Sequence, residues 1–412
     1  MYMNSEKAKN LRITKAIFGL SLILSIILSA LLLFNSLRWL IMIAVLAVIL
    51  FSGCRIANML DKRGRSYSWL LTIAVLNLFI MVPELSLRVA GFSYVSGIAN
   101  MAEEQFAVLR PEARSIFVPD KDLFWKLPSS NDNVNSYGFP GDEIEIPKPP
   151  NTYRILFLGD SVTQLGYPRF VERFFNVLLG NSSIQIECVT MAVAGYSSYQ
   201  GKVMAQLYAK KFQPDLAVVF YGWNDHWQAY GSIDSETEPP GDPGVLWHIY
   251  QNSRLLQFFF KLTRPIAGGE KSQIIDEVRV PIQEYEANLD EIESRFEGQD
   301  VPVVFITAPT SHYRLGVADY LVENQYAGSK EEVIILHKAY NEIVREIAAA
   351  SNAYLLDLEQ KVASLKNLEK IFLNDGIHFT REGTEVVANI IAEYIYDHVL
   401  PDSLKADESL IQ

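Results

Sequence analysis

The stretch RILFLGDSVTQLGYPRF, residues 154–170, decides how the fold is organised. The apolar run of a buried strand, 155–158, ends abruptly in Gly159-Asp160-Ser161, and an amphipathic segment follows. Asp and Ser suit a helix N-cap here, because both accept hydrogen bonds from the orphan N–H groups of a helix start. A serine on such a turn also suits a nucleophile, because its hydroxyl faces solvent where backbone N–H groups gather. On this stretch alone the cap is the ordinary interpretation of Ser161.

Downstream, short apolar runs alternate with helical stretches, which is typical of a parallel sheet covered on both faces. Predicted strands lie at 154–158, 184–190, 216–221, 303–307 and 353–358. Predicted helices lie at 170–179, 199–212, 331–350 and 381–399. Because ligands bind at the carboxyl ends of parallel strands, the residues that follow each strand are the candidates for a site.

Polar and glycine residues follow the predicted strands. The second strand leads to Gly195, the third leads to Asn224, and the segment Asp375-Gly376-Ile377-His378 precedes the last helix. Serine hydrolysis needs a hydroxyl nucleophile, an imidazole base, a carboxylate that orients the base, and donors for the oxyanion. Ser161, His378 and Asp375 supply the first three. The oxyanion donors are expected to be the N–H groups of Ser161 and Gly195 and the side-chain amide of Asn224.

These four blocks, in this order, resemble the SGNH (GDSL-type) hydrolases over roughly residues 153–399. The connector segment VNSYGF, residues 134–139, is similar to one that precedes the first block in membrane-anchored relatives. The resemblance implies an α/β domain of three layers, flavodoxin-like, with a central parallel sheet. It also implies ester hydrolysis through an acyl-enzyme on Ser161, with His378 as the base and Asp375 holding its tautomer, and with no metal or other cofactor. The chain departs from the family in block two, where an Asn usually shortly precedes the glycine and this sequence has Met191-Ala192-Val193-Ala194.

Aromatic residues cluster beside the third block. Trp223, Trp227 and Tyr230 are candidates for a sugar-stacking platform, because aromatic faces suit amphipathic ligands. His226 directly follows Asn224-Asp225 and is a candidate for a substrate contact. The alternative is that the aromatic residues pack an insertion, around residues 230–285, against the body of the domain.

Residues 1–92 are predicted to form a membrane anchor of about three transmembrane helices, since about 20 apolar residues span a bilayer. Apolar runs occupy 16–34, 39–54 and 68–82, the last extending towards 92. Basic clusters at 7–15 and 55–65 put the N-terminus in the cytoplasm by the positive-inside rule, so that three crossings leave the catalytic domain extracytoplasmic. Glu84 and Arg88 leave open two spans plus an interfacial helix, which would reverse this topology.

The rest of the chain divides into a connector at 93–150, a hydrolase domain at 151–401 and a tail at 402–412. A net charge of -12 argues against nucleic acid, which needs a basic face. The expected partners are the lipid bilayer and a small acylated carbohydrate or polymer substrate. We expect a serine esterase that removes an O-acetyl or other short acyl group from a carbohydrate or envelope polymer. Two alternatives stay open: an O-acyltransferase acting on an envelope polysaccharide with the same triad, and a catalytically silent polymer-binding module.

Overall fold

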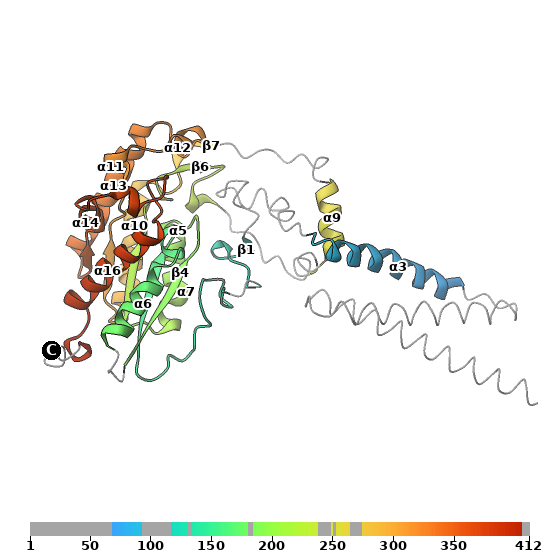
Figure 1. Cartoon of the computed structure of the whole chain (residues 1–412), viewed down its shortest axis with the longest axis horizontal. Coiled ribbons are helices and arrows are strands. Elements are labelled where there is room, and N and C mark those ends of the chain that lie inside the picture. Colours follow the sequence, from blue (N-terminus) through green and yellow to red (C-terminus); the bar gives the residue numbers. More distant parts are fainter. Residues whose placement is uncertain are drawn as a thin grey trace, which may run out of the picture. The chain divides into compact units, whose positions relative to one another are not determined.

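The computed structural model of the chain describes residues 68–92, 117–129, 133–179, 184–237, 249, 253–263 and 274–405 (Figure 1). The chain forms two compact units. The first comprises Met1–Ala102 and Asp242–Glu270, and the second comprises Glu103–Gly241 and Lys271–Gln412. All the candidate site residues belong to the second unit.

A five-stranded parallel sheet forms the centre of the second unit, with the order β4-β3-β5-β8-β9. Numbered along the chain this order is 2-1-3-4-5, which is the flavodoxin-like arrangement. The strands are β3 (Thr152–Gly159), β4 (Gln185–Ala192), β5 (Leu216–Phe220), β8 (Val303–Ile306) and β9 (Tyr354–Leu356). Because β3 lies between β4 and β5, the residues that follow these three strands meet at one rim.

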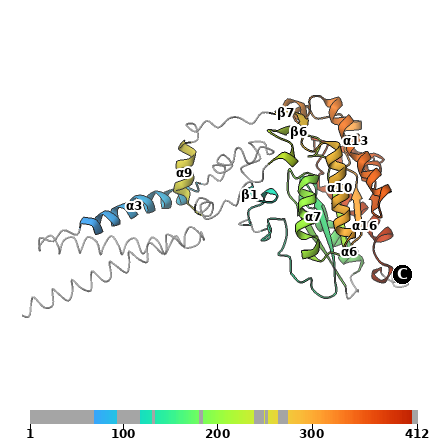
Figure 2. The same ribbon diagram turned by 180° about the vertical axis from the view of Figure 1, so that it is seen from behind.

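Helices cover both faces of this sheet. Ile155 and Phe157 of β3 share an apolar cluster with α6 (Tyr167–Leu178) and α16 (Arg381–His398), whereas Leu156 and Leu158 on the opposite face are also fully buried. Helix α10 (Ile282–Glu297) packs against both α7 (Ser198–Phe212) and α13 (Lys330–Ala350). Figure 1 shows α6 beside α16, and Figure 2 shows α7 beside α10. The three-layer α/β architecture expected from the sequence is therefore confirmed.

The predicted strands and helices agree with the structure to within a few residues, but α10 was not predicted. The first residues of this helix fall within the predicted insertion at 230–285. Apolar residues at 282, 285, 289, 292 and 296 repeat every three to four positions and give the pattern of an amphipathic helix. That spacing would have identified α10.

Short elements complete the second unit. Strands β1 (Val118–Asp120) and β2 (Phe124–Lys126) pair antiparallel within the predicted connector, and β6 (Gln228–Tyr230) pairs antiparallel with β7 (Ile274–Val278). The remaining elements are α5 (Ser161–Gln164), η3 (Asp234–Glu236), α11 (His312–Leu315), α12 (Asp319–Glu323), α14 (Leu358–Ala363), α15 (Leu368–Ile371) and η4 (Asp402–Leu404).

In the first unit, α3 (Ser68–Val89) contacts α9 (Arg254–Thr263). The Glu84 carboxylate accepts hydrogen bonds from the N–H groups of Arg254 and Leu255, at 3.0 and 2.8 Å, and so caps the start of α9. The third predicted span coincides with α3. Among the residues whose side chains the structure describes, which in α3 begin at residue 79, no helix is both long and apolar enough to cross a membrane. The first two predicted spans, 16–34 and 39–54, lie outside the described residues.

Candidate active site

The turn between β3 and α5 divides two tasks between neighbouring residues. The Asp160 carboxylate caps α5, accepting a hydrogen bond from the N–H of Val162 at 2.9 Å. Ser161 is therefore not needed as the cap, and its Oγ lies 2.8 Å from Nε2 of His378. Gly159 is required beside it, because a Cβ there would collide with the side chain of Thr163.

Asp375 fixes the ring of His378 in one orientation. Nδ1 of His378 donates to one carboxylate oxygen of Asp375 at 2.6 Å, and the other oxygen accepts from the N–H groups of Ile377 and His378, both at 2.9 Å. With its proton on Nδ1, the ring turns the lone pair of Nε2 towards Ser161. The structure thus brings the predicted trio together in a hydrogen-bonded chain.

The surroundings of Asp375 and His378 favour a negative charge on the carboxylate and a positive charge on the ring that accepts a proton. Burial works against ionisation of Asp375, but hydrogen bonds from the His378 ring and the Ile377 amide outweigh it and lower the pKa of the carboxyl. Burial likewise opposes the charged form of His378. The hydrogen bond and negative charge of Asp375, with a contribution from Asp160, outweigh that effect and raise the pKa of the ring above its ordinary value.

Residues that follow β8 hold the Asp375–His378 turn, and they were not among the predicted site residues. The carbonyl of Asp375 accepts a hydrogen bond from Nε2 of His312 at 2.7 Å. The carbonyl of Gly376 accepts from Oγ1 of Thr310 at 3.0 Å and from the N–H of Ser311 at 3.2 Å. Their position directly after the fourth strand of the sheet was the available signal.

The expected oxyanion donors lie at the same rim, but the two backbone donors have no acceptor among the described residues, whereas the side-chain donor already has two. The N–H groups of Ser161 and Gly195 have no acceptor in the part of the chain that the structure describes. The side-chain amide of Asn224 donates to the Asp160 carboxylate at 3.1 Å and to the Tyr196 carbonyl at 3.0 Å, which uses both of its protons. Asn224 would therefore have to exchange one of these acceptors before it could donate to an oxyanion.

The aromatic residues of the third block are not available to substrate. Trp223, His226 and Trp227 are only 2%, 1% and 6% exposed. Trp223 stacks on the ring of His337, and Trp227 stacks on Trp223. Burial also lowers the pKa of His226 to about 3, so its ring is neutral. The prediction that these three residues contact substrate is therefore wrong. The loop after β5 runs towards the interior of the unit, where the three side chains are buried.

The inward turn has a local cause. The carboxylate of Asp225, also fully buried, accepts hydrogen bonds from the N–H of Gly222 at 3.0 Å and from the N–H of Ser198 at 2.8 Å. Burial raises the pKa of this carboxyl to about 7. Asp225 thereby joins the loop after β5 to the start of α7.

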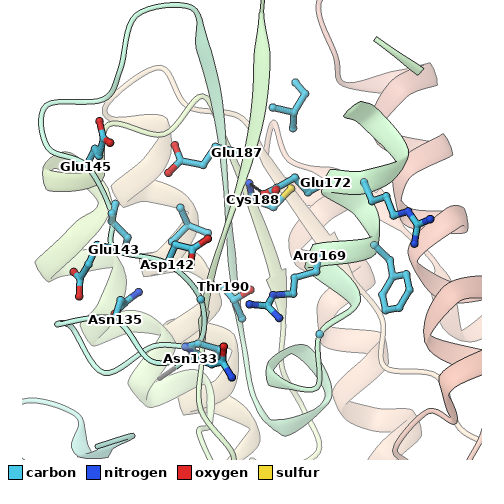
Figure 3. Close-up of a pocket in the computed structure, with 18 of the residues that line it drawn as sticks. Asn133, Asn135, Asp142, Glu143, Glu145, Arg169, Glu172, Glu187, Cys188 and Thr190 are labelled. Atoms are coloured by element: carbon cyan, nitrogen blue, oxygen red, sulfur yellow. Dashed lines mark hydrogen bonds between the residues drawn. The ribbon is translucent and has the colours of Figure 1, made fainter. Parts of the chain in front are cut away.

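A groove of about 780 Å³ runs along the outer edge of β4 (Figure 3). Its lining carries charges of both signs, from Asp142, Glu143, Glu145, Arg169, Glu172 and Glu187. None of the residues of the Ser–His–Asp chain lines it. The chemistry therefore belongs to the rim of the sheet and not to this groove.

A parallel α/β sheet with a hydrogen-bonded serine, histidine and aspartate at the carboxyl ends of its strands defines a class of protein, the serine hydrolases. Within that class, the chain belongs to the GDSL-like Lipase/Acylhydrolase family, whose pattern matches residues 157–386. The protein is accordingly a hydrolase of carboxylic esters.

Several solved structures are similar to this chain. A lipase/acylhydrolase from Enterococcus faecalis is 16% identical, with a TM-score of 0.38, over 59% of this chain and 95% of that one. A catalytic mutant of an acetylxylan esterase from Geobacillus stearothermophilus is 15% identical, with a TM-score of 0.37, over 59% and 94%. The esterase EstA from Pseudoalteromonas sp. is 12% identical, with a TM-score of 0.35, over 59% and 96%. A search of curated protein sequences finds no significant match.

Proposed function

We propose that the protein hydrolyses esters through an acyl-enzyme on Ser161, with His378 as the general base and Asp375 as the group that orients it. The observation that carries this proposal is the continuous chain from Ser161 Oγ to His378 Nε2, 2.8 Å, and from His378 Nδ1 to Asp375, 2.6 Å. Both lengths suit proton transfer along hydrogen bonds.

The reaction follows from these positions. Ser161 Oγ forms a bond to the carbonyl carbon of the ester while its proton moves to Nε2 of His378. The carbonyl oxygen becomes an oxyanion, which the free N–H groups of Ser161 and Gly195 can bind. When this intermediate collapses, the bond to the alcohol breaks and the alcohol leaves with the proton from Nε2. A water molecule then attacks the acyl-serine with His378 again as base, which releases the acid and restores Ser161.

Replacing the nucleophile tests the proposal. Ser161→Ala removes the attacking oxygen, and we expect kcat on p-nitrophenyl acetate to fall by roughly three to six orders of magnitude. Ser351→Ala is the matched control, because Ser351 precedes β9 and so lies at the opposite, amino end of the strands. Retention of turnover by the Ser161 variant would contradict the assignment, provided that the control also behaves as wild type.

For the substrate we propose an ester of a short acyl group, with an O-acetylated carbohydrate or envelope polymer as the alcohol. The support lies in the sequence, where no long apolar stripe follows Ser161 that a fatty chain would occupy. Because Trp223 and Trp227 are buried, sugar recognition cannot rest on their faces. A series of p-nitrophenyl esters from acetate to dodecanoate should give the highest kcat/KM at the short end, and an acetylated oligosaccharide should release acetate. A maximum at long chains would overturn the short-acyl assignment.

The acceptor is the second point to test, since an acyltransferase would use the same three residues. We propose water as the acceptor. With excess unacetylated oligosaccharide added to the reaction, free acetate should remain the main product. Product dominated by transferred acetyl groups would make the protein a transferase.

We further propose that residues 1–92 tether the catalytic unit to the outer side of a membrane. The two basic clusters that flank the first pair of apolar runs place both ends of that pair in the cytoplasm, so this orientation also requires the third apolar run, 68–82, to cross the membrane. Protease added outside the cytoplasmic membrane should digest the chain beyond residue 92. Protection until that membrane is lysed would favour the two-span arrangement.

A further inference from the structure

Side chains from different parts of the second unit hold residues 194–196, here called the oxyanion loop, at every carbonyl. The carbonyl of Ala194 accepts a hydrogen bond from Nε1 of Trp125 at 3.1 Å. The carbonyl of Gly195 accepts from Nη1 of Arg279 at 2.7 Å, and that of Tyr196 accepts from Asn224 at 3.0 Å. The N–H of Ala194 donates to the side chain of Gln164 at 2.5 Å. Among the residues that the structure describes, no acceptor binds the N–H of Gly195, so this backbone group of the loop is available to a ligand.

The hydrogen bond from Trp125 acts on the peptide unit that carries this N–H. The carbonyl of Ala194 and the N–H of Gly195 belong to one planar trans peptide and point in opposite directions. Fixing the carbonyl therefore fixes the direction of the N–H. Arg279 holds the following peptide through the Gly195 carbonyl, so both planes beside Gly195 are anchored. Gly195 can bend between them because its φ of 85° is available to glycine at little cost.

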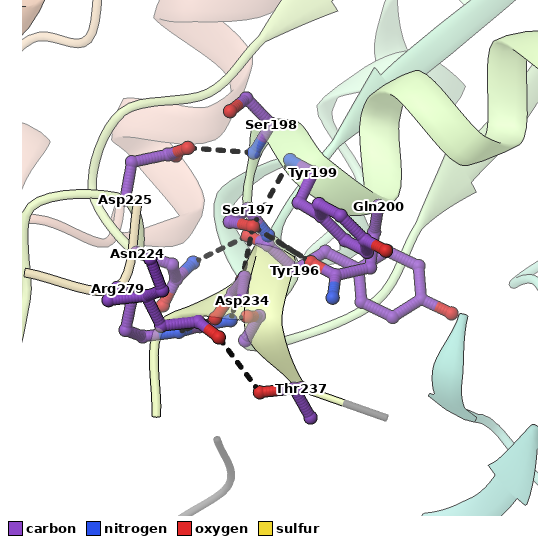
Figure 4. A network of polar contacts seen from close by, with 12 residues as sticks. Tyr196, Ser197, Ser198, Tyr199, Gln200, Asn224, Asp225, Asp234, Thr237 and Arg279 are labelled. Carbon is purple, nitrogen blue, oxygen red and sulfur yellow. Dashed lines mark hydrogen bonds and ion pairs between the residues drawn. The ribbon is translucent and has the colours of Figure 1, made fainter. Parts of the chain in front are cut away.

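Both anchors are themselves rigid. Trp125 is completely buried, and its own carbonyl accepts a hydrogen bond from the hydroxyl of Tyr196 at 2.6 Å. Arg279 is 5% exposed and donates to both oxygens of Asp234, at 3.1 and 2.8 Å (Figure 4). Asp234 is also bound by the hydroxyl of Ser197, the residue that follows the loop, at 2.6 Å. A guanidinium donor held this way is charge-assisted and directionally fixed.

We propose that Trp125 and Arg279 are positioning residues that aim the Gly195 N–H at the oxyanion. Neither contacts the reacting atoms, and both act through the oxyanion loop. The inference rests on the proposed function, since it needs an ester carbonyl attached to Ser161. The proposal gives a catalytic purpose to the connector strand β2 and to the residue that follows β7, two segments outside the four sequence blocks that supply Ser161, Gly195, Asn224 and the Asp375–His378 turn.

Conservative variants test the proposal without removing the packing. Trp125→Phe keeps a buried aromatic ring but removes the indole N–H donor. Arg279→Lys keeps the positive charge but removes the guanidinium group, which donates both to Asp234 and to the Gly195 carbonyl. Removing an oxyanion donor outright lowers kcat about 10²–10³-fold, so a misdirected donor should cost about 10–100-fold in kcat. KM for p-nitrophenyl acetate should stay within about threefold, because the ester contacts that N–H more strongly in the transition state.

Activity must be expressed per competent site, so that partial unfolding is not mistaken for misdirection. A fluorophosphonate titrates the fraction of chains with a reactive Ser161, and kcat is divided by that fraction. Arg154→Lys is the matched control. Arg154 is a buried arginine that pairs with Glu187 and donates to the Phe212 carbonyl, but it lies at the amino end of β3, away from Ser161. It should lower Tm and leave kcat per titrated site unchanged.

Asp234→Asn provides a second route to the same result, because it loosens Arg279 without altering it and should lower kcat per site in the same direction. Wild-type kcat per titrated site in Trp125→Phe and Arg279→Lys would overturn the proposal, as would a loss no greater than that of Arg154→Lys. Wild-type protein that is labelled at a serine other than Ser161 would instead overturn the proposed function. The two failures are therefore distinguishable.

Discussion

At Asp160 and Ser161, the choice between a helix cap and a nucleophile has a structural answer. The sequence offers Asp160 and Ser161 as caps, and Ser161 also as a nucleophile. In the structure Asp160 is the cap, and its buried carboxylate also accepts a hydrogen bond from Asn224. Burial raises the pKa of Asp160 to about 6 in spite of these donors. The hydroxyl of Ser161 is left with His378 as its partner.

The pKa shift of His378 predicts the pH dependence of the reaction. The base works in its neutral form, so kcat/KM should rise with pH through the pKa of His378, which lies above its usual 6.5. Asp375→Asn removes the charge that raises this pKa while burial, which lowers it, remains. The acidic limb of the profile should therefore move to lower pH, and kcat should fall by about 10²–10⁴ because the tautomer is no longer fixed.

Asp215→Asn is the control for this profile. Asp215 precedes β5 at the amino end of the sheet, where it binds the N–H of Arg154 at 2.7 Å. Its variant should keep the wild-type limb. An unshifted limb in the Asp375 variant would show that another group governs the acidic side of the profile.

At the scale of elements, the strands and most long helices could be predicted because their apolar periods are local properties of the sequence. The positions of Ser161, Gly195 and Asn224 follow from strand order, and that of the Asp375–His378 turn follows from its place directly before the last helix. The hydrogen bond between Trp125 and Ala194 does not, since the two residues are 69 positions apart and no periodicity links them. The burial of Trp223 and Trp227 could not be predicted from the sequence either, because it depends on the direction that the chain takes after β5.

The turn that carries Asp375 and His378 offers a test at this scale. Gly376 has a φ of 72°, and a Cβ there would lie 2.9 Å from Oγ of Ser311 and closer still to the buried ring of His312. Gly376→Ala should therefore displace the turn. We expect it to lower the free energy of unfolding by about 1–3 kcal/mol through overpacking, besides about 1 kcal/mol for the backbone. We also expect kcat to fall about tenfold or more, since small displacements of catalytic groups are costly.

Gly141→Ala separates these two effects. Gly141 also has a positive φ, 110°, but an added Cβ would meet no atom within 4 Å. It should show the backbone cost in a denaturant titration and keep its kcat. Equal kcat in the Gly376 and Gly141 variants would mean that His312 does not hold the catalytic turn.

At the scale of the whole molecule, the predicted domain limits do not match the limits of the working site. The site draws Trp125 from the predicted connector and Arg279 from the returning end of the predicted insertion, and both belong to the second compact unit. A domain cut at residue 151 would lack Trp125. Within the same insertion, residues 242–270 belong instead to the first unit together with residues 1–102. Contacts distant in sequence, which no local pattern reveals, determine these limits.

The central claim is that the second unit carries one nucleophile and that it is Ser161. The most direct measurement is to react the whole protein with a fluorophosphonate and to locate the label by mass spectrometry of its peptides. We expect one phosphonyl group per chain, on Ser161, with esterase activity lost in proportion to labelling, and no label in Ser161→Ala. A label on a different serine that accompanies the loss of activity, or an active and labelled Ser161→Ala variant, would contradict it.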